Sequence, residues 1–213
     1  SLNVFSGSWS ANGSGVGFAA ASIADGATLN LNGSIGGPVV VAAGGTLSGN
    51  ATTGPLTVNG TAAPGNSIGT ISIGGAQSFG PASIYRVEVD ACPGACADRI
   101  IATGPVTIGG GTVQVTTLAG LDGVFGARLP IVTGSSVSGT FGSLSVPADA
   151  FKSAFLEYTP QNVFLNILTS DFEDVAETEN QHAVAELLDH RASRRRLARE
   201  REAEAVSQIS ERI

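Results

Sequence analysis

The residue types that most often carry catalysis are unevenly distributed along this chain of 213 residues. Both histidines, His182 and His190, lie beyond residue 170. A Ser-His-Asp triad needs an imidazole beside the nucleophile, so residues 1–170 lack one unless a distant histidine folds back. The glycines at residues 109–111 are not accompanied by the lysine and helix that a phosphate-binding loop requires. We therefore expect no catalytic residue and no cofactor, and we predict that the protein is not an enzyme.

Carboxylates are the remaining candidates for chemistry in residues 1–170. Seven occur there: Asp25, Glu88, Asp90, Asp98, Asp122, Asp149 and Glu157. Glu88 and Asp90 fall on one face of a predicted strand, about 7 Å apart, and with Asp98 they could form a small Ca²⁺ site. We favour the alternative, in which these are surface residues paired with Arg86 and Arg99. No metal site is therefore predicted.

Cys92 and Cys96 are the only cysteines, and they enclose the sequence Pro-Gly-Ala. This spacing matches neither the CxxC motif of thioredoxin-like proteins nor a zinc site, which needs further Cys or His ligands nearby. We predict a local disulfide between the two cysteines, which is typical of an oxidising compartment. The alternative is a loop that carries two free thiols.

The composition changes abruptly near residue 170. Residues 1–170 contain all 29 glycines and all 9 prolines but only 11 charged residues, whereas residues 171–213 contain no glycine or proline and 18 charged residues. Runs of β-branched and aliphatic residues recur through the first part, bounded by Gly, Asn and Pro, as is typical of ordered strands. No stretch of about 20 apolar residues is present, so no membrane-spanning helix is expected. Residues 1–4 are already strand-like, so we expect any signal peptide to lie upstream.

Two sets of short motifs recur in the first part. One set begins with Gly-Pro at residues 37, 54 and 104, and the other begins with Gly-Thr or Gly-Ala at residues 26, 45, 60 and 75. The intervals within the second set are too short for βαβ units and predict the coils of a parallel β-helix. Glycine suits the sharp corners of such coils because it accepts positive φ. Asparagine also tolerates this conformation, and four asparagines lie beside the glycines: Asn32, Asn50, Asn59 and Asn66.

From residue 83 the predicted strands become longer and aromatic residues more frequent. Seven of the nine phenylalanines and both tyrosines lie after residue 78. We expect this part to be the more stable one and to act as a cap, because the open last coil of a solenoid exposes unpaired strand edges. We therefore divide the chain into β-helix coils at 1–82, a capping region at 83–170 and a charged region at 171–213.

Residues 171–213 are predicted to form a helix, because they contain no helix breaker and many Ala, Glu, Arg and Leu residues. Leu187, Leu188 and Leu197 form a partial apolar stripe that does not sustain heptads. The arginines from residue 191 onward could contact nucleic acid or lipid headgroups. A solvated helix with Glu–Arg pairs four residues apart is favoured instead. No base-stacking aromatic residue lies near the arginines, so no nucleic-acid partner is predicted.

Three sequence blocks, in order along the chain, resemble the passenger domains of autotransporters, which are secreted bacterial proteins. GTAAPGNSIGTISI at residues 60–73 is very similar to a segment near the end of these passengers. YRVEVD at residues 85–90 and ADRIIATG at residues 97–104 resemble the block that follows it in the family.

Later blocks continue the resemblance, which covers roughly residues 45–190. SGTF at residues 138–141 and YTPQNVFL at residues 158–165 are similar to the closing strands of the passenger. DFEDVAETENQHAVA at residues 171–185 resembles the linker helix that leads into the translocator barrel.

The resemblance implies a right-handed parallel β-helix with a C-terminal α-helix. It implies a structural stalk whose C-terminal coils act as an autochaperone, on which upstream coils fold, in a passenger that we expect to be a surface adhesin. It further implies a location at the bacterial cell surface, anchored at the outer membrane. Residues 171–190 would then contact the chain's own translocator barrel.

The sequence departs from the family after Asp189, where a membrane barrel would follow and this chain instead becomes rich in Arg and Glu. A second hypothesis is therefore an interaction or assembly protein, whose Arg/Glu-rich tail docks on a protein partner or oligomerises. A third is an enzyme built on a β-helix, such as a polysaccharide lyase that uses Glu88, Asp90 or Asp98.

Overall fold

The fold of this chain is built from strands alone over the part that the structure describes. The structure is a computed structural model, and it describes residues 1–13, 18–90, 96–117, 126–147, 152–169 and 178. Within these ranges the chain forms 21 strands and no helix. The prediction of an all-β fold is therefore confirmed for the described residues.

The strands belong to two sheets. The first has seven strands: β1 (Leu2–Val4), β3 (Ala21–Ile23), β5 (Val39–Val41), β8 (Leu56–Val58), β11 (Gln77–Phe79), β15 (Val106–Ile108) and β18 (Val137–Gly139). The second has 14 strands: β2 (Gly7–Gly13), β4 (Ala27–Ile35), β6 (Thr46–Gly49), β7 (Thr52–Thr53), β9 (Thr61–Pro64), β10 (Thr70–Ile73), β12 (Ile84–Asp90), β13 (Cys96–Ala97), β14 (Arg99–Ala102), β16 (Thr112–Thr117), β17 (Arg128–Thr133), β19 (Ser143–Ser145), β20 (Lys152–Tyr158) and β21 (Asn162–Thr169).

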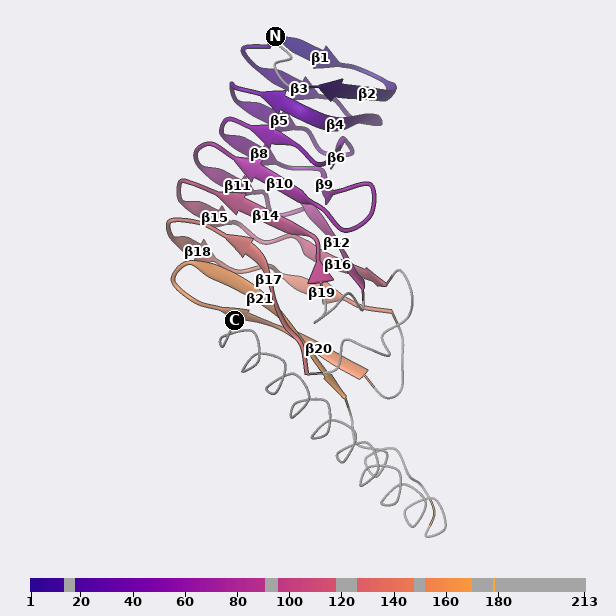
Figure 1. Ribbon diagram of the computed structural model, residues 1–213, viewed down its shortest axis with the longest axis vertical. Coiled ribbons are helices and arrows are strands. Elements are labelled where there is room, and N and C mark those ends of the chain that lie inside the picture. The colour runs from indigo at the N-terminus through magenta and orange to yellow at the C-terminus, as the bar shows by residue number, and fades with distance from the viewer. Residues whose placement is uncertain (14–17, 91–95, 118–125, 148–151, 170–177, 179–213) are drawn as a thin grey trace, which may run out of the picture. The chain divides into compact units, whose positions relative to one another are not determined.

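The chain returns to the same strand positions coil after coil (Figure 1). One coil contains β5, β6 and β7, and the next contains β8, β9 and β10, with each strand paired in parallel to its counterpart. The long strand β4 serves two positions, because residues 28–30 pair with β6 and residues 34–35 pair with β7. This parallel, coil-on-coil pairing is what the predicted solenoid requires.

Columns of apolar side chains fill the interior. The register of the seven-stranded sheet stacks residues that are at most 4% exposed in one such column: Val4, Ile23, Val41, Val58, Phe79 and Ile108. Each of these side chains buries apolar surface against the coils on either side, which is the main favourable term in folding. The alternation of buried and exposed residues along β3, β5 and β15 agrees with the predicted period of two.

The coils lengthen along the chain. In the seven-stranded sheet the interval between register partners shortens slightly at first and then grows, as the column of equivalent positions shows: Leu2, Ala21, Val39, Leu56, Gln77, Val106 and Val137. The Gly-Pro motifs at residues 37, 54 and 104 do precede equivalent strands, as predicted. The placement of the motif at residue 75 was wrong, because Gln77 pairs with Leu56 and Val106 and so belongs to the Gly-Pro set. The reason is the loop at residues 65–69, which lengthens this coil. Motifs that are equally spaced in the sequence therefore no longer occupy equivalent positions in successive coils.

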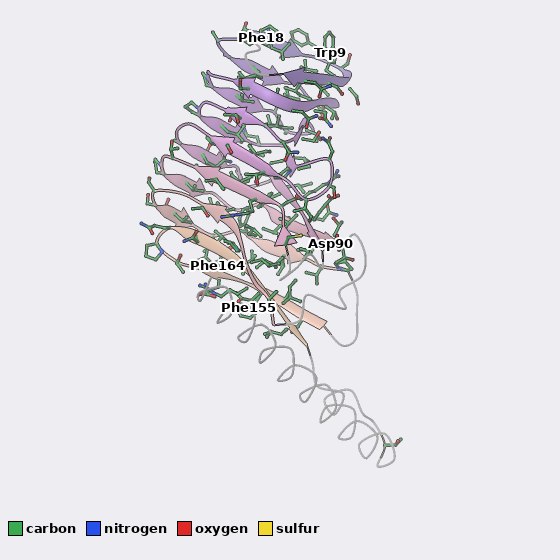
Figure 2. The ribbon with its side chains drawn as sticks, in the orientation of Figure 1. Trp9, Phe18, Asp90, Phe155 and Phe164 are labelled. Atoms are coloured by element: carbon green, nitrogen blue, oxygen red, sulfur yellow. The ribbon has the colours of Figure 1, made fainter. Side chains whose placement is uncertain are left out.

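The C-terminal end of this stack is closed by strands of opposite direction. β21 pairs antiparallel with β17, and β20 is the last strand of the sheet beyond β21. This antiparallel pairing covers the edge of β17, whereas β18 and β19 are the last strands of their parallel columns. At the other end, Figure 2 shows the aromatic side chains of Trp9 and Phe18.

The remaining predictions about organisation fall largely outside the described part. Residues 1–148 and 154–168 form one compact unit. The helix predicted at residues 171–213 lies outside the described residues, apart from Thr178. The division at residues 82 and 83 stays a prediction. The described residues include no helix that could cross a membrane.

Candidate functional site: the loop at residues 65–69 and the Asp98 clasp

The loop at residues 65–69 lies inside the sequence block that resembles autotransporter passengers, and its backbone is unusually constrained. Gly65 has a φ of +82°, a conformation that residues with a Cβ rarely adopt. Its amide and carbonyl form hydrogen bonds of 3.0 and 3.1 Å with Gly49. A Cβ on Gly65 would collide with the carbonyl oxygen of Ser67, and one on Gly69 would collide with the backbone of Gly65. Only glycine therefore fits at the two ends of this loop.

Asparagine side chains connect the loop to earlier coils. Asn66 donates to the Asn32 Oδ1 at 2.8 Å, and Asn30 donates to the Asn66 Oδ1 at 2.6 Å. Asn32 in turn donates to Asn12 at 3.0 Å and to Asn30 at 2.7 Å, and it accepts from the Asn50 amide at 3.1 Å. We call these five residues the asparagine ladder. It joins the loop to strands β2 and β4.

The same loop is connected to later coils by one buried carboxylate. Asp98 is 1% exposed, and its two oxygens accept hydrogen bonds from different segments. The Gly69 amide donates to Oδ1 at 2.7 Å, and the Glu88 amide donates to Oδ2 at 2.9 Å. We call the Asp98 carboxyl and these two amides the Asp98 clasp. It ties the loop to β12 and to the start of β14.

Burial perturbs the protonation of this site. Loss of hydration raises the pKa of the Asp98 carboxyl to about 7, and the amides of Glu88 and Gly69 only partly offset this. The charge of Glu88 raises it further. Burial, followed by the nearby Asp98, also raises the pKa of the Tyr85 hydroxyl well above its ordinary value.

Tyr85 connects the clasp to the apolar interior. Its hydroxyl donates to the Ile131 carbonyl at 2.7 Å, with a second contact of 3.3 Å to the Asp98 carbonyl. Its ring packs in a triangle with Phe79 and Phe141, at centroid distances of 5.7 and 6.3 Å, and those two rings are 5.0 Å apart. Aromatic pairs at these distances add about 0.5–1.5 kcal/mol to the burial of their area. One side chain thus links β11, β12 and β17.

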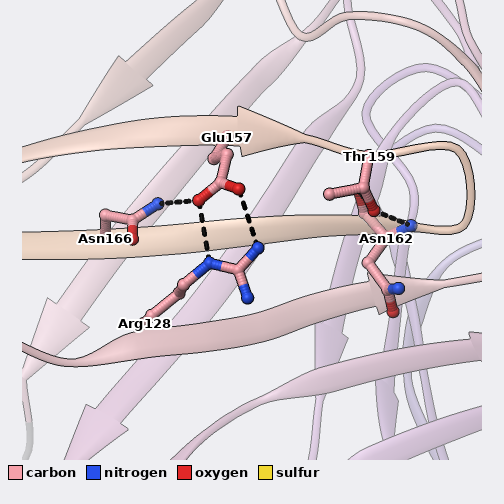
Figure 3. Close-up of polar contacts among 5 residues, drawn as sticks. All are labelled: Arg128, Glu157, Thr159, Asn162 and Asn166. Atoms are coloured by element: carbon pink, nitrogen blue, oxygen red, sulfur yellow. Dashed lines mark hydrogen bonds and ion pairs between the residues drawn. The ribbon is translucent and has the colours of Figure 1, made fainter.

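A second polar cluster holds the C-terminal cap (Figure 3). Arg128 on β17 donates two parallel hydrogen bonds to Glu157, of 2.8 and 2.7 Å, and Asn166 donates a third of 3.2 Å. The guanidinium also lies 3.4 Å from the centroid of the Phe164 ring. The hydrogen bonds from Arg128 lower the pKa of Glu157 to about 2. Because both charged side chains are partly exposed, this pair should add little stability.

The predicted surface pairing of the acidic residues near β12 was partly wrong. Asp98 is buried and binds backbone amides, because it follows β13 and lies beneath the loop at residues 65–69. Arg86 contacts the Gln114 side chain at 3.4 Å. The Arg99 Nε is buried without a hydrogen-bond partner. Among the described residues, no group of three or more His, Cys, Asp or Glu side chains could hold a metal ion.

Several predicted residues fall outside the described part of the chain. These are Cys92, Asp122, Asp149, His182 and His190. The disulfide between Cys92 and Cys96 therefore stays a prediction. The described backbone does bring the ends of that loop together, since Cys96 pairs with Asp90 across β12 and β13.

Two features of the site had little or no sequence signal. The alternation along β12 separates Tyr85 from Glu88 correctly, but the hydroxyl partners of Tyr85 are 13 and 46 residues away. The partners Arg128 and Glu157 are 29 residues apart, with nothing in the sequence to link them. Three of the five ladder residues, Asn32, Asn50 and Asn66, did have a signal, the recurrence of Asn beside Gly, although that recurrence predicts a backbone conformation at corners and not these hydrogen bonds.

Comparison with known proteins gives one informative similarity. No protein-family model matches this chain. Over 170 residues the chain is 32% identical to a protein of Serratia marcescens described as an extracellular serine protease. The match covers 74% of this chain, and the chain spans 16% of the length of that relative.

This similarity overturns the prediction that the protein is not an enzyme. That prediction rested on the absence of histidine from residues 1–170, which bears only on a triad within those residues. A chain that spans 16% of a serine protease can lack a triad while the protease has one elsewhere. The residues of this chain therefore do not decide whether the whole protein is catalytic.

Proposed function

We propose that this chain is a segment of a secreted autotransporter passenger, folded as a right-handed parallel β-helix, whose C-terminal coils act as the folding template for the coils before them. The passenger as a whole is proposed to be a proteolytic enzyme displayed at the bacterial surface. The proposed effector is a protease, and not the adhesin expected from the sequence, because the chain is similar to an extracellular serine protease.

The observation that carries this proposal is the position of the block at residues 60–73. Its loop is bound to earlier coils through Asn66 and to later coils through Gly69. A template must be able to hold both the part that folds first and the part that folds next. The resemblance of this block to autotransporter passengers and the match to an extracellular protease support the same assignment.

The structure of the C-terminal coils also supports a role as template. They contain the aromatic cluster of Phe79, Tyr85 and Phe141 and the antiparallel cap formed by β17 and β21. A capped, aromatic core can reach a stable state before the coils above it form, because β21 already covers the edge of β17. The upstream coils, by contrast, need a neighbouring coil to cover their edges.

Matched substitutions in the full chain test the template role. Val113 on β16 and Val41 on β5 are both 0% exposed, and each can be replaced by alanine. If the C-terminal coils form first, Val113→Ala should slow refolding, with a φ-value above about 0.5. Val41→Ala should mainly accelerate unfolding, with a φ-value below about 0.3. Stopped-flow folding and unfolding rates measure both, and the opposite pattern would refute the template.

The proteolytic arm requires the complete secreted protein. Purified protein should cleave denatured casein, and a serine-reactive sulfonyl fluoride should abolish the cleavage. Absence of cleavage, or cleavage that is insensitive to the reagent, would count against a serine protease. Neither result alters the test of folding order, because the two arms use different readouts.

Residues outside the described part enter the proposal as partners. Residues 171–190 are proposed to contact the chain's own translocator barrel, and the Arg/Glu-rich residues that follow are proposed to bind a protein partner. Deleting residues 191–213 should leave surface display unchanged but reduce co-purification of such a partner. Loss of display on this deletion would contradict the division of roles.

A further inference from the structure

We propose that the Asn59–Gly60 peptide is a site of spontaneous modification, at which the Asn59 carboxamide loses ammonia and the residue becomes aspartate or isoaspartate. The site lies at the corner between β8 and β9 (Figure 1). It falls within residues 1–82, whose single charged side chain is Asp25. The inference goes beyond the proposed function and is independent of it, because it rests on the environment of this one peptide bond.

The reaction is an attack of a backbone nitrogen on a side-chain carbon, and asparagine is chemically labile for this reason. The Gly60 amide nitrogen bonds to the Asn59 Cγ, the Cγ–Nδ2 bond breaks, and Nδ2 leaves as ammonia with the proton that the amide gives up. Water then opens the resulting succinimide ring. Opening at Cγ gives aspartate, and opening at the Asn59 main-chain carbonyl gives isoaspartate, in which the chain runs through Cβ. Glycine favours the attack because it has no Cβ beside the attacking nitrogen.

Both reacting groups of the Asn59–Gly60 pair are free of hydrogen bonds to the described part of the chain. The Asn59 side chain is exposed, and its carboxamide has no partner among the described residues. The amides on either side of Gly60 are engaged, since Asn59 donates to the Val41 carbonyl and Thr61 to the Gly45 carbonyl, both at 2.8 Å. Within the described ranges the Gly60 amide itself donates no such bond. The attacking nitrogen and the carbon that it attacks are therefore both available.

The other two Asn-Gly pairs of the sequence, at residues 12–13 and 32–33, are held more firmly. The Asn32 carboxamide takes part in four hydrogen bonds of the asparagine ladder. Gly33 lies within β4 and pairs with Gly13 on β2. Closing the succinimide ring turns the asparagine backbone out of the extended conformation, so Asn32 must leave the ladder before it reacts. Asn12 is intermediate, because its Oδ1 accepts one hydrogen bond, from Asn32.

The close packing around Gly60 makes the isoaspartyl product unfavourable for the fold. A Cβ on Gly60 would collide with the carbonyl oxygens of Ala42 and Gly45 in the preceding coil. On the other side, the Gly60 carbonyl accepts a hydrogen bond of 2.8 Å from the Ile84 amide of β12. Isoaspartate inserts one methylene into the main chain at this point, so the pairing with both neighbouring coils cannot be kept. We expect the corner between β8 and β9 to loosen as the product accumulates.

Residue-resolved NMR of the full chain in neutral buffer is the primary test, because each asparagine side chain gives its own NH₂ resonances. The Asn59 resonances should disappear at least about ten times faster than those of Asn32, which must first open locally. In protein unfolded by urea the two residues should react at similar rates, because both precede glycine. Loss of Asn59 that is no faster than loss of Asn32 in the folded protein would overturn the proposal. So would reaction of Asn59 in the unfolded chain alone.

Variants identify the product and its position. Isoaspartyl methyltransferase with a labelled methyl donor should label the aged full chain, and Asn59→Gln should remain almost unlabelled, because glutamine must close a larger and less favourable ring. Asn32→Gln is the matched control and should be labelled like the unmodified protein. Equal labelling of Asn59→Gln would place the reaction elsewhere and refute the site. Loss of the Asn59 resonances without any labelling would contradict the isoaspartyl product.

Hydrogen exchange then tests the structural consequence. In the aged protein the amides of Thr61 and Ile84, which bond across the corner, should exchange faster. The Ala21 amide, which donates to the Pro38 carbonyl in an earlier pair of coils, should stay protected. Asn59→Asp introduces the charge without the extra methylene and should leave the Thr61 and Ile84 amides protected. Equal loosening in Asn59→Asp would assign the effect to charge and contradict the lengthening of the main chain as its cause.

Discussion

The N-terminal and C-terminal coils achieve cohesion in different ways. The coils from β1 to β8 are short and nearly equal in length, have Asp25 as their single charge, and stack aliphatic side chains in columns. The coils from β11 onward are longer and contain the aromatic cluster, the Asp98 clasp and the antiparallel cap. The first group is held together by similar aliphatic contacts that recur from coil to coil. The second is held together by contacts that each occur at one place in the fold.

This difference has a consequence for how each part tolerates change. In a repetitive stack each coil contacts only its neighbours, so the cost of a substitution should remain local. In the C-terminal coils the single side chain of Tyr85 contacts residues that are 13 and 46 positions away in the sequence. A substitution there should weaken several coils together. The loop at residues 65–69 lies between the two groups of coils and contacts both, through Asn66 and Gly69.

The largest expected difference between the two regions involves their aromatic residues. Phe141 is 7% exposed and packs on Phe79, whereas Trp9 in the N-terminal coil is 60% exposed. Phe141→Ala should lower the free energy of unfolding by about 3–5 kcal/mol, because it removes buried area and leaves a cavity. Trp9→Ala should change it by less than about 1 kcal/mol. Urea unfolding of both variants measures the contrast, and similar losses would remove the distinction between the regions.

The transition loop should be the next most sensitive position. Gly65→Ala combines a disfavoured φ of +82° with a collision against the Ser67 carbonyl, so a loss above about 2 kcal/mol is expected. Gly26→Ala is the matched control, since Gly26 has a φ of +68° but nothing within 4 Å of the added Cβ. It should cost about 1 kcal/mol from backbone conformation alone. Equal losses in thermal unfolding would mean that the loop is not tightly packed.

The sequence predicted the repetitive part better than the unique part, for a physical reason. Strand alternation and corner glycines are local features, so β-branched runs such as Val39–Val41 were correctly assigned to strands. The spacing of coils was predicted only while it stayed short and nearly constant. Once the loop at residues 65–69 lengthened a coil, the motif at residue 75 was assigned to the wrong set.

Contacts that occur once leave no periodic trace in a sequence. The environment of Asp98 depends on a loop 29 residues earlier, so its burial could not be predicted from its charged neighbours. The blocks that resemble autotransporters, residues 60–73 and 97–104, include Gly69 and Asp98, but the resemblance does not indicate that these two residues contact each other. Only the structure shows that contact.

The asparagine ladder offers a smaller test within the N-terminal coils. Asn32→Ala removes side-chain hydrogen bonds to Asn12, Asn30 and Asn66, and the expected loss is about 1 kcal/mol because the ladder is partly exposed to water. Ser48→Ala is the control, on the strand position next to Asn30, and should change stability by less than about 0.5 kcal/mol. Hydrogen exchange should show that Asn32→Ala loosens β2 and β6 while β14 stays protected. Equal loosening of β14 would mean that the repetitive coils do not respond locally.

The smallest expected effect concerns the cap, and its pH dependence should have the opposite sign to that of the clasp. Arg128 holds the pKa of Glu157 at about 2, below its ordinary 4.5, so this pair stabilises the protein above pH 4.5 and ceases to do so as the pH falls through about 2. Acid therefore weakens the cap. The Asp98 carboxyl has the opposite effect, because its pKa is raised from 3.8 to about 7 on folding, so its contribution to stability is present at acidic pH and is lost as the pH rises through about 7. Because the pair is exposed, Glu157→Gln should lower the melting temperature less than Phe141→Ala, Gly65→Ala or Asn32→Ala does, and the difference should largely vanish in roughly 1 M salt. Arg128→Lys, which keeps the charge but loses the two parallel hydrogen bonds, should resemble Glu157→Gln if geometry matters more than charge. If Glu157→Gln lowers the melting temperature by the same amount at high salt, the cap depends on this pair. The last strands of the C-terminal coils would then be held by a single specific contact, as the coils around Tyr85 are.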